Sequence, residues 1–438
     1  MLGLMPVKNN IPATRVRYTI LAAVFVTVVI NYMDRTNISV AGSLISKELH
    51  LDTVQMGYIF SAFSWTYATL QIPGGILADR FGARILYSII LILWSLATLA
   101  LGFAIGFVSV ILLRILIGAF EAPAYPMNNR IVTSWFPDDE RAGAIATYTS
   151  GQFIGLAFLT PVLTAIQLYA GWRGLFIITG MVGMVWGVSW YFIYRNPMEH
   201  KKVNEAELMH IEKGGAIFER KPDDPQAGRK FKWKNLWFIL SKKKLWGIYL
   251  GQFGLGATLI FFLTWFPKYL VDFKHMDFLK SGFMVSLPFL CAFAGVLFSG
   301  YLSDYLVKKK VSAGKARKSP VVIGLLLSMS IIGANYVTRP AWVIFFMSLA
   351  FFGNGLASIT WVFVSLLAPK NLIGLTGGIF NFIGGLAGIV VPITIGYLVK
   401  GGDFSPALLF ISCMTLMGAL SYIFLVGKIE RIQEVSRP

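Results

Sequence analysis

Residues 75–105 read GILADRFGARILYSIILILWSLATLALGFAI, a short charged turn followed by an apolar run. No charged side chain occurs from residue 85 to residue 113. A helix that crosses a bilayer needs about 20 predominantly apolar residues. The run is therefore long enough to span a membrane, and the charged turn before it is typical of a loop between two spans.

The same pattern recurs along the whole chain. Of the 438 residues, 56% are hydrophobic and 14% are charged, whereas soluble domains carry about 25% charged residues. A large soluble core would not keep its charges out of so many successive windows. We therefore predict an all-α polytopic membrane protein with twelve spans. They cover residues 18–44, 54–78, 84–105, 108–135, 140–169, 172–194, 245–271, 278–307, 318–337, 341–367, 371–399 and 404–427.

The net charge of +18 follows the membrane topology. Of the 39 Lys and Arg residues, Arg35 and Arg114 lie deep inside predicted spans, and the others lie in loops or near span ends, seven on one side of the membrane and 30 on the other. Cytoplasmic loops of membrane proteins carry such an excess of Lys and Arg. We therefore expect both termini and the long loop 195–244 to face the cytoplasm, and we expect no nucleic-acid partner.

The loop 195–244 divides the chain into an N-terminal bundle, 1–194, and a C-terminal bundle, 245–438, each with six helices. We expect one short amphipathic helix in the loop, near Asn204–Lys213. Internal matches predict that the bundles are pseudo-symmetric, as in transporters with a binding site where the halves meet. The matches are Gly75–Asp79 with Gly300–Asp304, and Gly143 and Pro161 with Gly374 and Pro392, both pairs being 18 residues apart.

Four ionisable residues lie well inside predicted spans: Asp34, Arg35, Arg114 and Glu121. A charge at the bilayer centre costs about 2.5–3.5 kcal/mol on insertion scales, so such groups normally face a cavity and pair together. With both acids ionised the four charges sum to zero, and protonating the acids leaves a positive site for an anion. The alternative is a set of buried ion pairs that only fix helix packing.

Side-chain chemistry suggests a role for each charge. Arg offers a planar fork for a carboxylate, so we expect Arg35 to bind the substrate and Arg114 to pair with the acids. Asp34 and Glu121 are the candidate proton-coupling groups. Arg114 and Glu121 are seven residues apart, about 10 Å along one helix face, whereas adjacent Asp34 and Arg35 point about 100° apart.

The C-terminal half offers neutral polar and aromatic side chains, which suit the hydroxyls and apolar face of a sugar acid. Each of them also has an ordinary packing role in membrane helices. The candidates are Asn354, Ser358, Thr360, Trp361 and Asn381, extended from the other half by Tyr32, Tyr67 and Gln152.

The run from Gly75 to Arg84 resembles the signature loop between the second and third helices of the major facilitator superfamily. In it, Gly82 makes a tight turn and Asp79 is able to pair across the bundle, with Arg141 as a candidate partner. We interpret this group as a conformational latch and not as a substrate site. Its residues are Gly75, Asp79, Arg80, Gly82, Arg84 and Arg141.

Within that superfamily the chain resembles the anion:cation symporters, and most closely the bacterial sugar-acid transporters of the D-galactonate type. The resemblance implies import of a sugar-acid anion driven by protons. It also places Tyr32, Tyr67, Gln152, Trp361 and Asn381 at the sugar-acid site. Transporters of doubly charged hexarates tend to carry Lys where this chain has Asn354. The resembling segments are residues 31–37, 120–130, 150–153, 351–355 and 377–382.

Other functions find little support. No phosphate-binding loop of the Gly-x4-Gly-Lys-Ser/Thr type occurs, the four histidines are scattered in loops, and two cysteines are too few for a disulfide framework. We therefore expect no enzyme activity, no metal and no cofactor beyond coupling protons, in a monomer of the bacterial inner membrane. A hexarate or other organic-anion symporter or exchanger, and a non-transporting sensor, stay open as alternatives.

Overall fold

The computed structural model describes residues 12–216, 233–309, 312–369 and 372–433, which are helical or irregular and contain no strand. The N-terminal helices are α1 Val16–Glu48, α2 Thr53–Phe81, α3 Ala83–Leu101, α4 Phe107–Glu121, α5 Ala124–Trp135 and α6 Asp138–Ile193. The linker holds η1 Pro197–Glu199, α7 Glu205–Lys213 and α8 Trp233–Leu240. The C-terminal elements are α9 Lys243–Thr264, α10 Phe266–Lys268, η2 Tyr269–Phe273, α11 Phe278–Lys308, α12 Ala313–Ser328, η3 Met329–Asn335, α13 Pro340–Leu356, η4 Ala357–Thr360, α14 Trp361–Leu367, α15 Ile373–Leu398, α16 Ser405–Leu420 and η6 Ser421–Val426.

The prediction of twelve spans is confirmed. Ten helical stretches of the described residues are long and apolar enough to cross a membrane. One of them, α6, holds two spans, because its chain turns at Gly171 with φ +70°, a conformation that favours glycine. These ten stretches therefore supply eleven spans, and the 29-residue α2 is the twelfth.

Two predicted spans are interrupted. The fourth is divided between α4 and α5 at Pro123, which precedes the first residue of α5. The tenth is divided into α13 and α14 by the tight turn η4. The short helix expected near Asn204–Lys213 is confirmed as α7, whereas α8 was not predicted.

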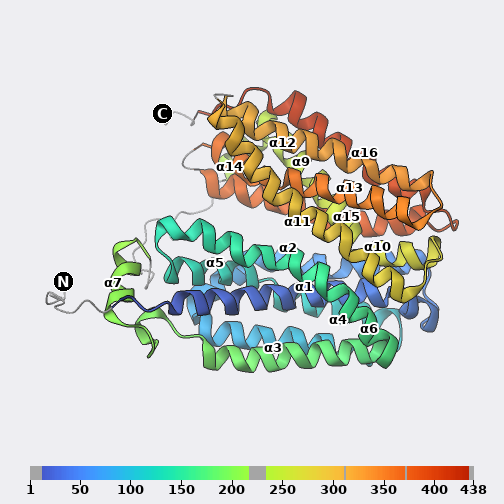
Figure 1. Cartoon of the computed structure of the whole chain (residues 1–438), viewed down its shortest axis with the longest axis horizontal. Helices are drawn as coiled ribbons and strands as arrows, with labels where there is room; N and C mark the ends of the chain where they lie inside the picture. The colour runs from blue at the N-terminus through green and yellow to red at the C-terminus, as the bar shows by residue number, and fades with distance from the viewer. Residues whose placement is uncertain (1–11, 217–232, 310–311, 370–371, 434–438) are drawn as a thin grey trace.

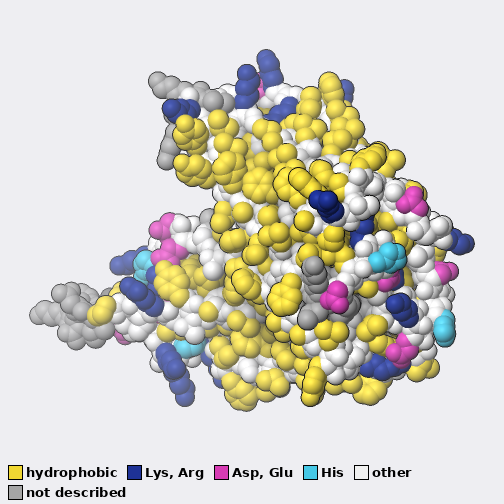
Figure 2. All heavy atoms as spheres, turned by 45° about the vertical axis from the view of Figure 1, so that its right-hand side comes forward, with side chains coloured by type: hydrophobic (Ala, Val, Ile, Leu, Met, Phe, Trp, Pro, Cys, Tyr) yellow, Lys and Arg dark blue, Asp and Glu magenta, His cyan; other side chains and the backbone are white. Residues whose placement is uncertain are grey.

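Helices α1 to α6 form one bundle and α9 to η6 form the other (Figure 1). The bundles meet at the end where α10 lies and separate at the end where α5, α7 and α14 lie. Figure 2 shows the surface hollowed between them and hydrophobic side chains covering much of the face in view. Across the interface α2 packs on α15 and α6 on α11, as expected if the two halves are related by a pseudo-two-fold axis.

The end of the interface near α10, called here the closed end, is tightly packed. A Cβ added at Gly57 of α2 would lie 2.6 Å from the carbonyl oxygen of Pro392 in α15. The Thr53 hydroxyl donates to the Gly396 carbonyl (3.0 Å), and the Lys268 ammonium donates to Ser46 Oγ (2.9 Å). Lys268 is only 4% exposed and also pairs with Asp272.

At the opposite end, α7 is fastened to the start of α1 by a buried carboxylate. Glu207 accepts hydrogen bonds from Thr14 Oγ1 (2.6 Å) and from the backbone amides of Val16 and Arg17 (both 3.1 Å). These amides belong to the first turn of α1, which has no intrahelical partners for them. The Arg17 guanidinium pairs with Glu207 (3.3 Å) and with Glu140 of α6 (3.0 Å), so α7 belongs to the N-terminal bundle.

Candidate functional site

The central contact of the site joins α1 to α4. Arg35 donates through Nε (2.7 Å) and Nη2 (2.5 Å) to the same carboxylate oxygen of Glu121, whose side chain is fully buried. The guanidinium also lies 4.5–4.9 Å from the ring centres of Tyr67, Tyr32 and Phe63, within cation–π range. Glu121 is thus paired with Arg35, and the expected pairing with Arg114 is not the one that the structure contains.

Arg114 occupies the other end of the same helix face. It is 3% exposed, and its Nε and Nη1 have no hydrogen-bond partner among the described residues. Its guanidinium lies 5.2 Å from the Phe63 ring and interacts electrostatically with Glu121, Arg35 and Asp34. Burying a charge without hydrogen bonds is costly, so this cation is available to an anion that enters the site.

Asp34 faces away from its neighbour Arg35 and into the N-terminal bundle. It is 1% exposed, and neither carboxylate oxygen has a hydrogen-bond partner in the part of the chain that the structure describes. The Trp94 indole lies beside it. A carboxyl in such surroundings is far less costly to bury when it carries a proton.

Arg35, Arg114 and Tyr67 line one cavity of about 120 Å³ between the bundles. The N-terminal wall comes from α1, α2 and α4, and the facing wall comes from α9 and α15. The absence of a side chain at Gly388 lets α15 lie close to α2, since a Cβ at Gly388 would lie 2.4 Å from Ser64 Oγ of α2. The remaining lining residues are Phe60, Phe63, Ser64, Ala68, Ile260, Leu263, Thr264, Gly384, Gly385 and Gly388.

Besides Tyr67, which lines the cavity, three of the predicted neutral residues make hydrogen bonds near its lining residues. The Tyr32 hydroxyl donates to Gln152 Oε1 (2.9 Å), which joins α1 to α6 beside Arg35. Asn381 of α15 donates across the bundle interface to Gln71 Oε1 (3.0 Å), one turn along α2 from Tyr67. Polar groups of both halves therefore meet next to the paired charges.

The other predicted residues of the C-terminal half lie behind this wall. Thr360 donates to Gln252 Oε1 (2.9 Å), and Gln252 packs against Gly384 of the cavity lining. Asn354 is 5% exposed and donates to the Leu255 carbonyl (2.8 Å). Trp361 is half exposed and edge-on to Phe380, and Ser358 is half-buried in η4.

Sequence reasoning missed Phe63, Gln71 and Gln252. Phe63 stacks on Tyr67 and lies under both arginines, but one phenylalanine among 35 gives no signal of its own. The two glutamines were detectable as uncharged polar residues inside apolar runs, the same signal that identified Gln152.

The latch residues are described only in part. Gly82 adopts φ +74° and makes the predicted turn between α2 and α3. Arg84 donates to the Tyr191 carbonyl (3.1 Å), and Arg141 pairs with Asp138 (2.6 Å). The remaining latch residues, Gly75, Asp79 and Arg80, are not among those whose surroundings the structure describes.

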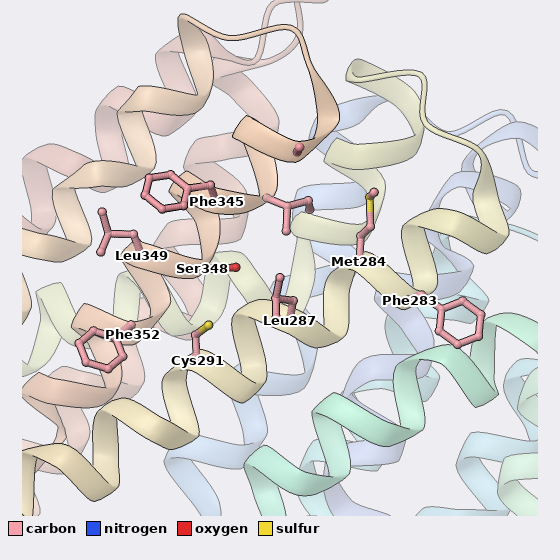
Figure 3. A pocket seen from close by; sticks show the side chains of 10 residues that line it. Phe283, Met284, Leu287, Cys291, Phe345, Ser348, Leu349 and Phe352 are labelled. Carbon is pink, nitrogen blue, oxygen red and sulfur yellow. The ribbon is translucent and has the colours of Figure 1, made fainter.

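A second cavity, of about 820 Å³, lies on the C-terminal bundle between α11 and α13 (Figure 3). Phe283, Leu287 and Cys291 of α11 line it from one side, and Phe345 and Phe352 of α13 from the other. Among the side chains that the structure describes, no charged one lines this cavity. Its apolar walls suit lipid chains and give an anion no partner.

Comparison with known proteins supports the membrane-carrier architecture. Residues 24–392 match the family described as Major Facilitator Superfamily. The chain is 51% identical over 428 residues to a D-galactonate transporter of Escherichia coli O6:H1, covering 98% of this chain and 99% of that one. It is 41% identical to a probable galactarate/D-glucarate transporter of Escherichia coli K12 (95% and 96% covered) and 32% identical to a hexuronate transporter of Bacillus subtilis (92% and 93% covered).

Solved structures share the fold at low sequence identity. The inward open conformation of the xylose transporter XylE from Escherichia coli aligns with a TM-score of 0.73 at 15% identity, covering 94% of this chain and 98% of that one. A bacterial homologue of the lysosomal transporter Spinster, in an inward-facing and occupied conformation, aligns with a TM-score of 0.71 at 19% identity (95% and 96% covered).

Proposed function

The chain belongs to the Major Facilitator Superfamily, and on that premise we propose that it is a secondary transporter that imports a sugar-acid anion together with protons. The observation that carries the proposal is the pair of buried arginines lining one cavity with a carboxylate bonded to one of them. Two fixed positive charges attract a carboxylate, and an adjacent acid gives a proton a place to bind.

The contact between Arg35 and Glu121 suggests how the two are coupled. An ionised Glu121 occupies the Nε and Nη2 donors of Arg35, the fork that a substrate carboxylate requires. Protonation of Glu121 removes the charge that holds the guanidinium and releases these donors. Binding of the proton and of the anion are then cooperative, which is the thermodynamic requirement for symport.

Asp34 is the second proposed proton site. It is buried in the N-terminal bundle outside the cavity lining, within electrostatic range of Arg114. Protonation of Asp34 leaves Arg114 with less neighbouring negative charge and so favours the anion-loaded state. Each acid is thus associated with one arginine, although only the contact between Glu121 and Arg35 is an ion pair in this conformation.

We propose a hexonate such as D-galactonate as the substrate. The similarity to the D-galactonate transporter supports this choice, and Tyr32, Gln152 and Asn381 offer neutral partners for sugar hydroxyls. A hexarate is the alternative, because named galactarate/D-glucarate transporters are 41% identical. Asn354 supports the hexonate, since it supplies no charge for a second carboxylate.

We further propose that the open end, with α5, α7 and α14, faces the cytoplasm of a bacterial cell. The excess of Lys and Arg at this end supports that orientation. In this orientation the hollow seen in Figure 2 opens inward and the closed end faces outward. We propose that the monomer is the working unit.

Uptake by purified protein in liposomes tests the proposal. Labelled D-galactonate, galactarate and glucuronate are each supplied with and without an inward proton gradient. We expect concentration of D-galactonate only with the gradient, and weaker uptake of galactarate. Preference for galactarate would favour the alternative substrate. Accumulation that requires substrate inside the liposomes and does not respond to the proton gradient would contradict proton symport and indicate an exchanger, and binding without uptake would indicate a sensor.

A further inference from the structure

The inference concerns α14, a short half-helix at the open end of the C-terminal bundle. It is separated from α13 by η4 and covers only Trp361–Leu367. Its first residue, Trp361, is a candidate site residue, and the residue before it, Thr360, bonds to Gln252. Whatever holds the other end of α14 therefore influences where Trp361 lies.

The chain after η6 holds that other end. Gly427, with φ +58°, turns the chain back across the end of the C-terminal bundle. Lys244 of α9 donates to the Lys428 carbonyl (3.1 Å), and Ile429 packs against Gly314 of α12. Residues 427–432, called here the tail strap, thus cross from η6 past α12 to α14.

At α14 the tail strap makes three hydrogen bonds. Arg431 donates through Nη2 to the Ser365 carbonyl (2.8 Å) and through Nη1 to the Ala368 carbonyl (3.3 Å). The amide of Ile432 donates to the Leu367 carbonyl (2.9 Å). The last four carbonyls of a helix lack intrahelical partners, and a cation at this end also interacts favourably with the helix dipole.

We propose that Arg431 is a positioning residue for transport: by holding the carboxyl end of α14, it fixes Trp361 at the opposite end against Gly377 and Phe380 of α15, the helix that supplies part of the cavity wall. The proposal rests on the proposed function for its effect on substrate affinity. The clamp itself depends only on contacts within the protein. Arg431 lies at the exposed rim of the bundle, about two helical turns from Trp361, and does not touch the cavity lining.

The first test measures amide hydrogen exchange in full-length protein, without substrate. In Arg431→Ala, residues 361–368 should exchange about tenfold faster, because a hydrogen bond from a charged donor contributes a factor of that order, while α13 stays unchanged. Arg431→Lys should recover part of the protection. Glu430→Ala is the matched control, since Glu430 lies toward Lys244 (3.9 Å) and not toward α14. Unchanged exchange in Arg431→Ala would overturn the clamp.

The second test is a double-mutant cycle on uptake of D-galactonate. Arg431→Ala should raise KM about three- to tenfold with a smaller change in kcat, and this effect should vanish when Trp361→Ala is already present. Additive effects, or an unchanged KM, would overturn the positioning role. If wild-type protein transports no sugar acid, the proposed function fails, while the exchange experiment still decides the clamp.

Discussion

In the proposed mechanism, the Glu121 carboxylate competes with the substrate carboxylate for Arg35, so a proton on Glu121 favours anion binding. Its carboxylate holds two donors of Arg35 in a site with no exposure to solvent. The change Glu121→Gln keeps the shape and one acceptor but removes the charge, so it imitates the protonated acid. We expect the variant to bind D-galactonate within about threefold of wild type, because it leaves Arg35 accessible to a carboxylate.

The same variant should lose gradient-driven accumulation by at least about tenfold, while exchange of labelled for unlabelled substrate continues. Binding and both transport modes are measured on purified Glu121→Gln, with the exposed Glu205→Gln as control. Intact accumulation would leave Asp34 as the coupling acid. Loss of binding together with folding yield would show that Glu121 only braces Arg35.

Asn354 provides a test of charge selectivity. It is buried between α13 and α9 and bonds to the Leu255 carbonyl, a contact that a lysine ammonium is also able to make. Asn354→Lys adds a cation behind the C-terminal wall and should shift preference toward galactarate over D-galactonate by about tenfold, or 1.4 kcal/mol. Competition uptake measures the ratio, and Asn354→Met controls for side-chain length. An equal shift in both variants would attribute the effect to packing.

The identity of the charged residues was predictable from the sequence, but their pairing was not. Asp34, Arg35, Arg114 and Glu121 stand out because charges are rare within apolar runs. Which arginine meets Glu121 depends on the rotation of α1 about its axis, and packing against α6 and α2 sets that rotation. Aromatic neighbours such as Phe63 carry no comparable signal, because apolar side chains cover every membrane helix.

Among the elements, α7 has a specific attachment that makes it part of the N-terminal bundle. Glu207→Ala removes the carboxylate that caps the first turn of α1 and pairs with Arg17. We expect the free energy of unfolding to fall by about 2–4 kcal/mol, because the variant loses both a helix cap and hydrogen bonds between charged groups. Thermal unfolding of the purified protein should show a Tm lower by several degrees. Glu212→Ala, an exposed change on the same helix, should leave Tm unchanged, and an equal fall in both would contradict the docking role.

Helix boundaries show how far apolar length and capping residues in the sequence predict the structure. Apolar length identified each span within a few residues, and the capping residue Asn204 marked the start of α7. The interruption at Pro123 follows from the proline itself, which lacks an amide hydrogen and clashes with the preceding helical turn. The interruption at η4 depends on tertiary packing, since η4 packs against α12 and α11 and Thr360 bonds to Gln252. The Gly-Asn-Gly sequence at residues 353–355 precedes η4 but does not fix where the helix is interrupted.

At the scale of the whole molecule, the two bundles are held in this conformation by contacts at the closed end. Gly57 lies against the Pro392 carbonyl with no room for a side chain. Next to it, the hydroxyls of Tyr58 and Tyr397 are 3.3 Å apart. Alternating access requires these contacts to open when the opposite end closes. The stability of the closed end therefore sets the balance between the two states.

Gly57→Val tests this balance. A Cβ 2.6 Å from backbone oxygen is closer than any real contact, so α2 and α15 must separate, and overpacking of this kind costs about 1–3 kcal/mol. That penalty falls only on the conformation with the closed end packed, so it shifts the ratio of the two states by about 5- to 150-fold.

Cysteines at positions 58 and 397, in a Cys291→Ser and Cys413→Ser background, should cross-link with lower yield in Gly57→Val, and uptake should fall with it. Gly378→Val on α15 is the control, because a Cβ there meets nothing within 4 Å. Equal cross-linking in Gly57→Val and wild type would mean that the interface absorbs the side chain without separating, and that the glycine contact does not govern the conformational balance.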